Sequence, residues 1–240
     1  MRKYGYIHSK ETYGALDGPG IRYVLFMQGC PLHCLFCHNP DTWNMNEGKR
    51  VSTDEVLDDI LKYRSFIKKG GVTLSGGEPL LQAEFCAELF VKCKAAGIHT
   101  AIDTSGNVPL NDAKKVIDET DLVLLDIKSL DNELCRKITG SGNENALNML
   151  KYCEEIGKDV WIRHVLVPGI TLNRELLDDL AEYLRQFTCI SRIELLPFHK
   201  LGEYKWKQLK IQYTLEDTRE PTKEEIQMAE DIFRKKGFEV

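Results

Sequence analysis

The sequence predicts an α/β fold in which helices cover a parallel sheet. Strand-like and helix-like segments alternate six times along the 240 residues, which is typical of parallel strands joined by crossover helices. The strand-like segments are continuous apolar runs, as expected where a sheet is covered on both faces. Six units are fewer than the eight of a closed barrel, so two alternatives stay open: an open doubly wound sheet and an incomplete, splayed barrel.

The individual elements follow from apolar runs, helical spacing and stop signals. Short apolar runs predict strands at 21–27, 71–74, 99–102, 122–125, 160–167 and 191–196. Apolar spacing near 3.6 predicts helices at 53–69, 82–96, 111–118, 145–156, 174–187 and 223–236, the last within about 222–237. Ser52 and Thr53 are candidate caps of the first helix, while Gly97 and Gly157 are expected to stop the second and the fourth.

Composition and charge are typical of a globular protein with one core. The chain is 42% hydrophobic and 29% charged, and we expect a single domain over 1–240. The net charge is 32 − 37 = −5, which implies no basic face, so nucleic acid and anionic membranes are poor partners. No apolar run approaches the ~20 residues that span a bilayer, and the first residues lead into no apolar signal core. We therefore expect a cytoplasmic protein.

The eight cysteines divide into a group of three and five single residues. In a reducing compartment disulfides are not expected, and we interpret the single cysteines as small buried core residues: Cys86, Cys93, Cys135, Cys153 and Cys189. Cys30, Cys34 and Cys37 form a C-x3-C-x2-C loop that can place three sulfurs on one metal centre. A structural zinc would need a fourth ligand, from His33 or His38, whereas a cubane iron–sulfur cluster would keep one iron without a protein ligand. An iron without a protein ligand can bind a substrate or cofactor, so the open position favours a catalytic metal site over a structural one.

Chemically capable side chains also follow the predicted strands where each strand ends. Cys30, Glu78, Asp103, Asp126 and His199 come directly after the last apolar residues of a strand. Ligand sites of parallel α/β proteins lie beyond the carboxyl ends of the strands. We therefore expect these five groups to converge at one edge of the sheet.

The cysteine loop and the segment 75–79, Ser-Gly-Gly-Glu-Pro, together resemble the radical S-adenosylmethionine (SAM) superfamily. There, three cysteines hold a [4Fe–4S] cluster whose fourth iron binds SAM, and the glycines let the main chain approach its amino group. Further segments resemble the pyruvate formate-lyase activating enzymes of that superfamily: 17–22, 28–30, 37–43, 82–85, 103–106, 125–128, 161–163 and 194–199. The resemblance implies an incomplete (βα)6 barrel. The absence of cysteine from 38–72 points to one cluster and to this branch rather than to activases with a ferredoxin-like insert.

The resemblance also implies roles for individual residues. Cys30, Cys34 and Cys37 are the implied cluster ligands and catalytic residues. The implied SAM-binding residues are Phe36 and His38 at the adenine, Gly76, Gly77 and Glu78 at the methionine amino group, Asp126, Ile127, Lys128 and Arg163 at the ribose and carboxylate, and His199 at the ribose or adenine. Asp103, Thr104 and Asp126 resemble a site for sodium or potassium. Asp17 is the implied contact to a substrate peptide.

The activity implied by the resemblance is the activation of formate C-acetyltransferase, also called pyruvate formate-lyase. One electron from the reduced cluster would split SAM into methionine and a 5′-deoxyadenosyl radical, which would take a hydrogen atom from a glycine on a loop of the partner and leave a glycyl radical. Flavodoxin or ferredoxin would donate the electron. Two alternatives stay open: a radical SAM enzyme acting on a small molecule, and a non-catalytic module that holds zinc or carries electrons.

Overall fold

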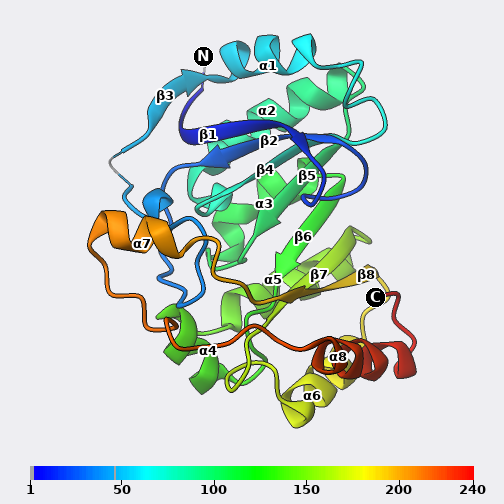
Figure 1. Cartoon of the computed structure of the whole chain (residues 1–240). Helices are drawn as coiled ribbons and strands as arrows, with labels where there is room; N and C mark the ends of the chain where they lie inside the picture. Colours follow the sequence, from blue (N-terminus) through cyan, green and yellow to red (C-terminus); the bar gives the residue numbers. More distant parts are fainter. Residues whose placement is uncertain (1–2, 46) are drawn as a thin grey trace. The chain divides into compact units, whose positions relative to one another are not determined.

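The computed structural model describes residues 3–45 and 47–240 (Figure 1). The strands are β1 (Tyr4–Gly14), β2 (Arg22–Met27), β3 (Lys49–Ser52), β4 (Gly71–Gly76), β5 (Thr100–Thr104), β6 (Leu122–Asp126), β7 (Asp159–Leu166) and β8 (Ile190–Pro197). The helices are α1 (Thr53–Lys62), α2 (Ala83–Ala95), α3 (Leu110–Glu119), α4 (Asn132–Thr139), α5 (Glu144–Glu155), α6 (Arg174–Leu184), α7 (Glu203–Leu209) and α8 (Lys223–Lys235). The chain divides into two compact units: unit 1 holds the residues up to 31 and 42–124, and unit 2 holds 32–41 and 125–240.

Unit 1 contains a sheet with the strand order β3-β1-β2-β4-β5. β2, β4 and β5 are parallel, while β1 is antiparallel to both β2 and β3. Helix α2 packs on these strands and touches α1 on one side and α3 on the other (Figure 1). The register places Met27 beside Gly76, so β2 and β4 end together. The segments that follow these two strands therefore start from the same edge of unit 1.

Unit 2 contains the end of β6 together with β7 and β8. β7 and β8 are parallel, and their register places Arg163 beside Glu194. Directly after β6, the Ile127 amide donates to the Arg163 carbonyl at 3.0 Å. The segment 32–41 belongs to this unit because Phe36 is buried in an apolar cluster with Ile138, Val167, Phe198 and Leu215.

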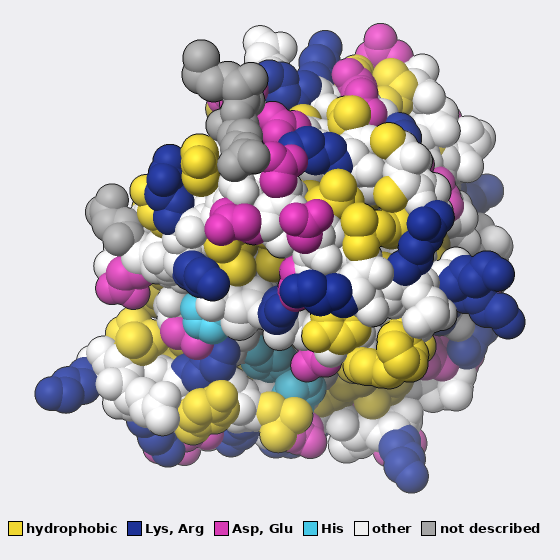
Figure 2. All heavy atoms as spheres, turned by 90° about the horizontal axis from the view of Figure 1, so that it is seen from above, with side chains coloured by type: hydrophobic (Ala, Val, Ile, Leu, Met, Phe, Trp, Pro, Cys, Tyr) yellow, Lys and Arg dark blue, Asp and Glu magenta, His cyan; other side chains and the backbone are white. Residues whose placement is uncertain are grey.

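The architecture is an α/β fold with a partial, open parallel sheet, consistent with an incomplete barrel. Over the described ranges the strand order is β3-β1-β2-β4-β5-β6-β7-β8. On the face in Figure 2, basic and acidic side chains are interspersed. None of the helices built from the described residues is both long enough and apolar enough to cross a membrane.

The predicted strands and helices of all six units are present, and most boundaries differ by only a few residues. Ser52 caps α1 through a capping box with Glu55, and Gly97 and Gly157 follow α2 and α5 with positive φ. The first helix ends at Lys62, which is earlier than expected. There the Tyr63 amide bonds back only three residues, and tight turns carry the chain on to 69.

Four elements were missed by the sequence reasoning: β1, β3, α4 and α7. Two register shifts interrupt β1 opposite β2, so its buried residues do not alternate regularly. Helices α4 and α7 span 8 and 7 residues, too few for a clear helical period. In α4 the local signals are the caps, since Asp131 accepts from the Leu134 amide and Gly140 follows the helix with positive φ.

Candidate functional site

The turn after β4 requires glycine at two positions. Gly76 has a φ of +106°, and a Cβ there would lie 2.5 Å from the Met27 nitrogen. A Cβ at Gly77 would lie 2.2 Å from the Gly29 carbonyl oxygen. The Gly77 amide donates to the Met27 carbonyl at 3.0 Å, and the Glu78 amide donates to the Gly29 carbonyl at 2.8 Å. Glycine is therefore required at both positions by the close approach of the 27–29 main chain, and the approach of Gly76 and Gly77 to a ligand stays a prediction.

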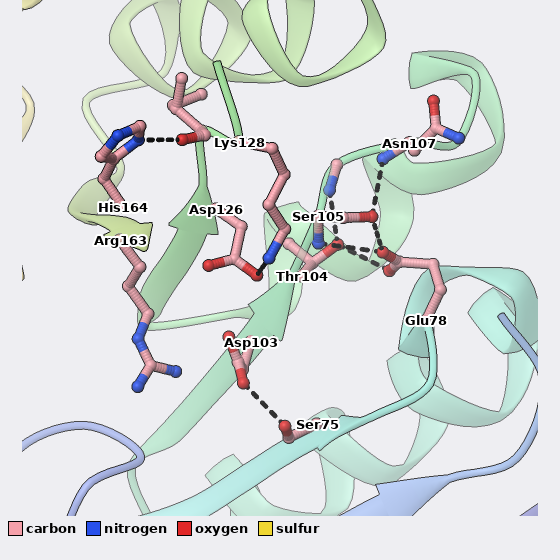
Figure 3. Close-up of polar contacts among 12 residues, drawn as sticks. Ser75, Glu78, Asp103, Thr104, Ser105, Asn107, Asp126, Lys128, Arg163 and His164 are labelled. Atoms are coloured by element: carbon pink, nitrogen blue, oxygen red, sulfur yellow. Dashed lines mark hydrogen bonds and ion pairs between the residues drawn. The ribbon is translucent and has the colours of Figure 1, made fainter. Parts of the chain in front are cut away.

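The side chain of Glu78 is fully buried and surrounded by hydrogen-bond donors (Figure 3). Its Oε1 accepts from the Thr104 hydroxyl at 2.6 Å and from the Leu80 amide at 3.1 Å. Its Oε2 accepts from the Ser105 hydroxyl at 2.6 Å and from the Ser105 amide at 3.0 Å. Burial raises the pKa of Glu78, and these hydrogen bonds oppose that shift. The carboxylate thus joins the ends of β4 and β5, and its role toward SAM stays a prediction.

The two residues at the end of β5 point in different directions (Figure 3). Asp103 accepts a hydrogen bond from the Ser75 hydroxyl at 2.7 Å. Thr104 turns instead toward Glu78, and its hydroxyl oxygen also accepts from the Gly106 amide at 2.9 Å. The third expected cation ligand, Asp126, belongs to unit 2.

Asp17 lies beside the middle of β4 rather than at the end of the strand. The Thr73 hydroxyl donates to the Asp17 carbonyl at 2.6 Å and accepts from Arg22 Nε at 2.6 Å. β4 ends at Gly76, three residues after Thr73, which places the Asp17 carbonyl about 10 Å before the strand's end. Arg22, which sequence reasoning missed, is fully buried, and burial lowers its pKa to about 10 against the opposing effect of Asp17. The Gly-Pro-Gly segment after Asp17 indicates a turn in the sequence, but it does not indicate that Arg22 holds this turn through the Pro19 carbonyl.

The cysteine loop passes from unit 1 to unit 2. All three cysteines are half-buried. The Cys30 amide donates to the Trp43 carbonyl at 3.3 Å within unit 1. Within unit 2, the Cys37 amide closes a turn onto the Cys34 carbonyl at 3.0 Å, and the indole of Trp206 donates to the Cys37 carbonyl at 2.9 Å. Trp206 lies in α7, an element without a sequence signal, and was therefore missed.

The surroundings of Cys34 suit a metal-bound thiolate. Burial raises the pKa of Cys34 to about 12, while the ammonium of Lys128 acts in the opposite direction. A metal ion would supply the positive charge that this thiolate needs. Within 3–45 and 47–240, no three His, Cys, Asp or Glu side chains converge on a single ion position. The thiolates of a cubane bind separate irons and do not need to converge in that way.

Two charged side chains leave the end of β6 on the same side (Figure 3). Lys128 Nζ lies 2.6 Å from Asp126 Oδ2 and 5.5 Å from the ring centroid of Phe36. The ammonium is thus placed between a carboxylate and an aromatic face. Ile127, the residue between them, is buried. The arrangement can present one cationic and one anionic group to a zwitterionic ligand.

Arg163 and His164 stand on opposite sides of β7. Arg163 Nε lies 3.2 Å from Glu194 Oε2 on β8. The motif that contains Glu194 was recognised in the sequence, but this carboxylate was not assigned a role. His164 is buried, and its Nδ1 lies 2.7 Å from the Ile127 carbonyl oxygen. Burial lowers the pKa of His164 to about 4, so the ring is neutral at pH 7.

His38 and His199 form a stacked pair in unit 2. Their ring centroids are 4.2 Å apart with 30° between the ring planes, and His38 Nε2 donates to the His199 carbonyl at 3.1 Å. Burial lowers the pKa of His38. Lys205 of α7 holds the same loop through Asn39 at 2.9 Å and Asp41 at 3.0 Å. These flat faces are suited to stacking on a purine.

The expectation of buried core thiols is confirmed for Cys86, Cys93, Cys135 and Cys153. It is wrong for Cys189, which is half-buried. Cys189 precedes β8 in a loop, and its amide donates to Glu154 Oε2 at 2.8 Å.

The expected site residues are therefore grouped within each unit. Unit 1 brings together Gly76, Gly77, Glu78, Asp103 and Thr104. Unit 2 brings together Cys34, Phe36, Cys37, His38, Asp126, Ile127, Lys128, Arg163 and His199. Cys30 follows β2 in unit 1, at the edge where β4 also ends. Asp17 is the exception, because it lies further back along β4.

Comparison with known proteins identifies the family. The model of the radical SAM superfamily matches residues 24–181. A pyruvate formate-lyase-activating enzyme from Staphylococcus epidermidis is 47% identical over 94% of this chain and 93% of its own length.

Solved structures agree with this match. A domain of pyruvate-formate lyase-activating enzyme from Bacteroides vulgatus is 27% identical with a TM-score of 0.60, covering 71% of this chain and 96% of that one. A radical SAM methyltransferase from Sphaerobacter thermophilus shares the fold over 91% of this chain and 65% of its own, with 17% identity and a TM-score of 0.68. The chain thus belongs to the radical SAM superfamily and, within it, to the family of the pyruvate formate-lyase-activating enzymes.

Proposed function

We propose that this protein activates pyruvate formate-lyase by generating a glycyl radical in it. The structural observation that carries the proposal is the part of the cysteine loop in unit 2, where the ring of Phe36, packed against Cys34, lies 5.5 Å from the ammonium that pairs Lys128 with Asp126. The 47% identity over 94% of the chain to an enzyme of that name supports the same partner. Membership of the radical SAM superfamily implies a [4Fe–4S] cluster and SAM.

When bound, the cluster and SAM supply the one-electron cleavage of the C5′–S bond and the carbon radical that takes hydrogen from a glycine. Cys30, Cys34 and Cys37 would hold three irons of the cluster. Lys128 would bind the carboxylate of SAM, because an ammonium is a natural partner for a carboxylate. Phe36 and the His38–His199 pair would position the adenine by stacking. These residues would orient the cofactor, which must hold the reacting atoms within roughly 3–4 Å of each other for the hydrogen transfer.

Several finer features belong to the same proposal. Asp103, Thr104 and Asp126 would bind a monovalent cation, with Asp103 and Thr104 supported by their position at the end of β5. The parallel strands β2, β4, β5, β6, β7 and β8 would form the incomplete (βα)6 barrel of a single domain. Flavodoxin or ferredoxin would donate the electron in the cytoplasm. Asp17 would contact the substrate peptide through its carboxylate, because Thr73 holds only its main-chain carbonyl.

Anaerobic reconstitution tests the function directly. The protein is loaded with iron and sulfide and mixed with reductant, SAM and pyruvate formate-lyase containing glycine deuterated at the α-carbon. We expect a glycyl-radical signal by electron paramagnetic resonance and deuterium in the 5′-deoxyadenosine product, and neither with the Cys34→Ala variant.

The alternatives give different results in the same experiment. An enzyme acting on a small molecule would cleave SAM without a radical in the added protein. A zinc module would contain no cluster, whereas a [4Fe–4S] protein contains about four irons per chain. Either result would overturn the proposed function.

A further inference from the structure

His164 makes a buried hydrogen bond whose direction is set by its partner. The side chain is only 4% exposed, and its Nδ1 lies 2.7 Å from the Ile127 carbonyl oxygen. A carbonyl oxygen can only accept, so Nδ1 must carry the hydrogen and donate it. The neutral ring expected from the lowered pKa is then the Nδ1–H tautomer.

The peptide unit that His164 holds lies between two residues of the candidate site. Ile127 follows Asp126 and precedes Lys128, and its side chain is buried. Its amide donates to the Arg163 carbonyl at 3.0 Å, and its carbonyl accepts from His164. The main-chain amide and carbonyl of Ile127 are therefore both held by β7, through the consecutive residues Arg163 and His164.

We propose that His164 is a positioning residue for SAM, acting through the Ile127 carbonyl to hold Asp126 and Lys128 in place. The inference rests on the proposed function, because it takes these two residues as part of the SAM site. β6 ends at Asp126, and the hydrogen bonds of Ile127 to β7 continue to hold the main chain at the next residue. Without the imidazole, a buried carbonyl would lack its donor, and the chain would shift to find one. A shift of about 1 Å in a binding group is enough to weaken ligand binding strongly.

Three substitutions separate the hydrogen bond from the volume of the ring. His164→Asn keeps an N–H donor near the position of Nδ1. His164→Gln places its amide near the position of Nε2, and His164→Leu has no donor. We expect the equilibrium dissociation constant and the KM for SAM to rise at least about tenfold in the Leu and Gln variants. In His164→Asn both should stay within about threefold of wild type, and kcat should change less than threefold throughout.

Two measurements besides turnover accompany these values. SAM binding is measured by equilibrium dialysis on the unreduced, cluster-loaded protein, with iron per chain determined for each variant. Nuclear magnetic resonance of protein labelled with 15N-histidine reports which ring nitrogen of His164 carries hydrogen. We expect a protonated Nδ1 in the wild type and about four irons per chain in every variant, since the cysteines are not altered.

The outcomes are distinct. A wild-type protein that does not cleave SAM overturns the proposed function and this inference with it. If the wild type cleaves SAM, then an unprotonated Nδ1, or a Leu variant that binds SAM as tightly as wild type, overturns the inference alone. Should the Leu variant not fold, the comparison of Asn with Gln decides, and equal SAM affinity in these two variants contradicts the role of the Nδ1 donor.

Discussion

The Glu78 carboxylate accepts a hydrogen bond from the Thr104 hydroxyl at 2.6 Å, which ties the turn after β4 to the end of β5. Each oxygen of this carboxylate also faces a main-chain amide, Leu80 for Oε1 and Ser105 for Oε2. A hydroxyl can turn and become an acceptor, but a main-chain amide cannot. The site therefore accepts a carboxylate and rejects an amide in the same place.

From this relationship we predict that Glu78→Gln destabilises the protein by about 2–3 kcal/mol, because the new NH2 group must face an amide donor. The free energy of unfolding in urea, measured without oxygen, checks the value. The same change at the exposed Glu220 should stay within about 0.5 kcal/mol. Equal stability of the Glu78→Gln variant and the wild-type protein would contradict the hydrogen-bond pattern.

Gly77→Ala should disturb the segment that leads to Cys30. The new Cβ would lie 2.2 Å from the Gly29 carbonyl oxygen, so the main chain must move. We expect a loss of about 3 kcal/mol or more and fewer irons per chain after reconstitution. Gly97→Ala is the matched control, because its φ is +69° but no atom lies within 4 Å of the added Cβ. It should cost only about 1–2 kcal/mol and keep full iron content. Gly77 has no positive φ, so the loss expected there comes from the contact with Gly29, and full iron content in the Gly77→Ala variant would contradict the effect on Cys30.

Trp206→Phe should loosen the cysteine loop while keeping most of the packing of the ring. The change removes the indole N–H that donates to the Cys37 carbonyl at 2.9 Å. We predict a loss of about 1–2 kcal/mol and faster release of iron to a chelator under anaerobic conditions. Trp161→Phe makes the same chemical change in β7, where the ring contacts Arg192, and should leave iron release unchanged. Unchanged release in the Trp206 variant would contradict a role for this hydrogen bond in holding the loop.

The neutral His164 predicts a loss of stability in mild acid. Burial lowers its folded pKa to about 4, below the unfolded value near 6.5. Between these values the unfolded chain binds a proton that the folded chain does not, so stability falls as the pH falls. The wild type should lose about 2 kcal/mol more than His164→Asn between pH 7 and pH 5, measured by urea unfolding. Parallel pH profiles for the two proteins would rule out a neutral, buried ring.

The alternation of apolar strands and helices was sufficient to predict the α/β class. Strands such as β4 and β6 are almost wholly buried, and their composition records this directly. The edge strand β1 was missed because it is largely exposed and irregular, so its position depends on pairing with β2 and β3. Pairing between strands is a property of the folded chain, and no local pattern encodes it.

The sequence by itself determined the chemistry of the site: three thiols at a fixed spacing, and charged groups at strand ends where a parallel sheet must place them. Only the tertiary structure decided how these groups are held. Glu78 meets Thr104 across 26 residues, His164 meets Ile127 across 37, and Trp206 meets Cys37 across 169. Such hydrogen bonds depend on distance and direction to about 0.5 Å, which are properties of the packed chain and not of the spacing of residues along it.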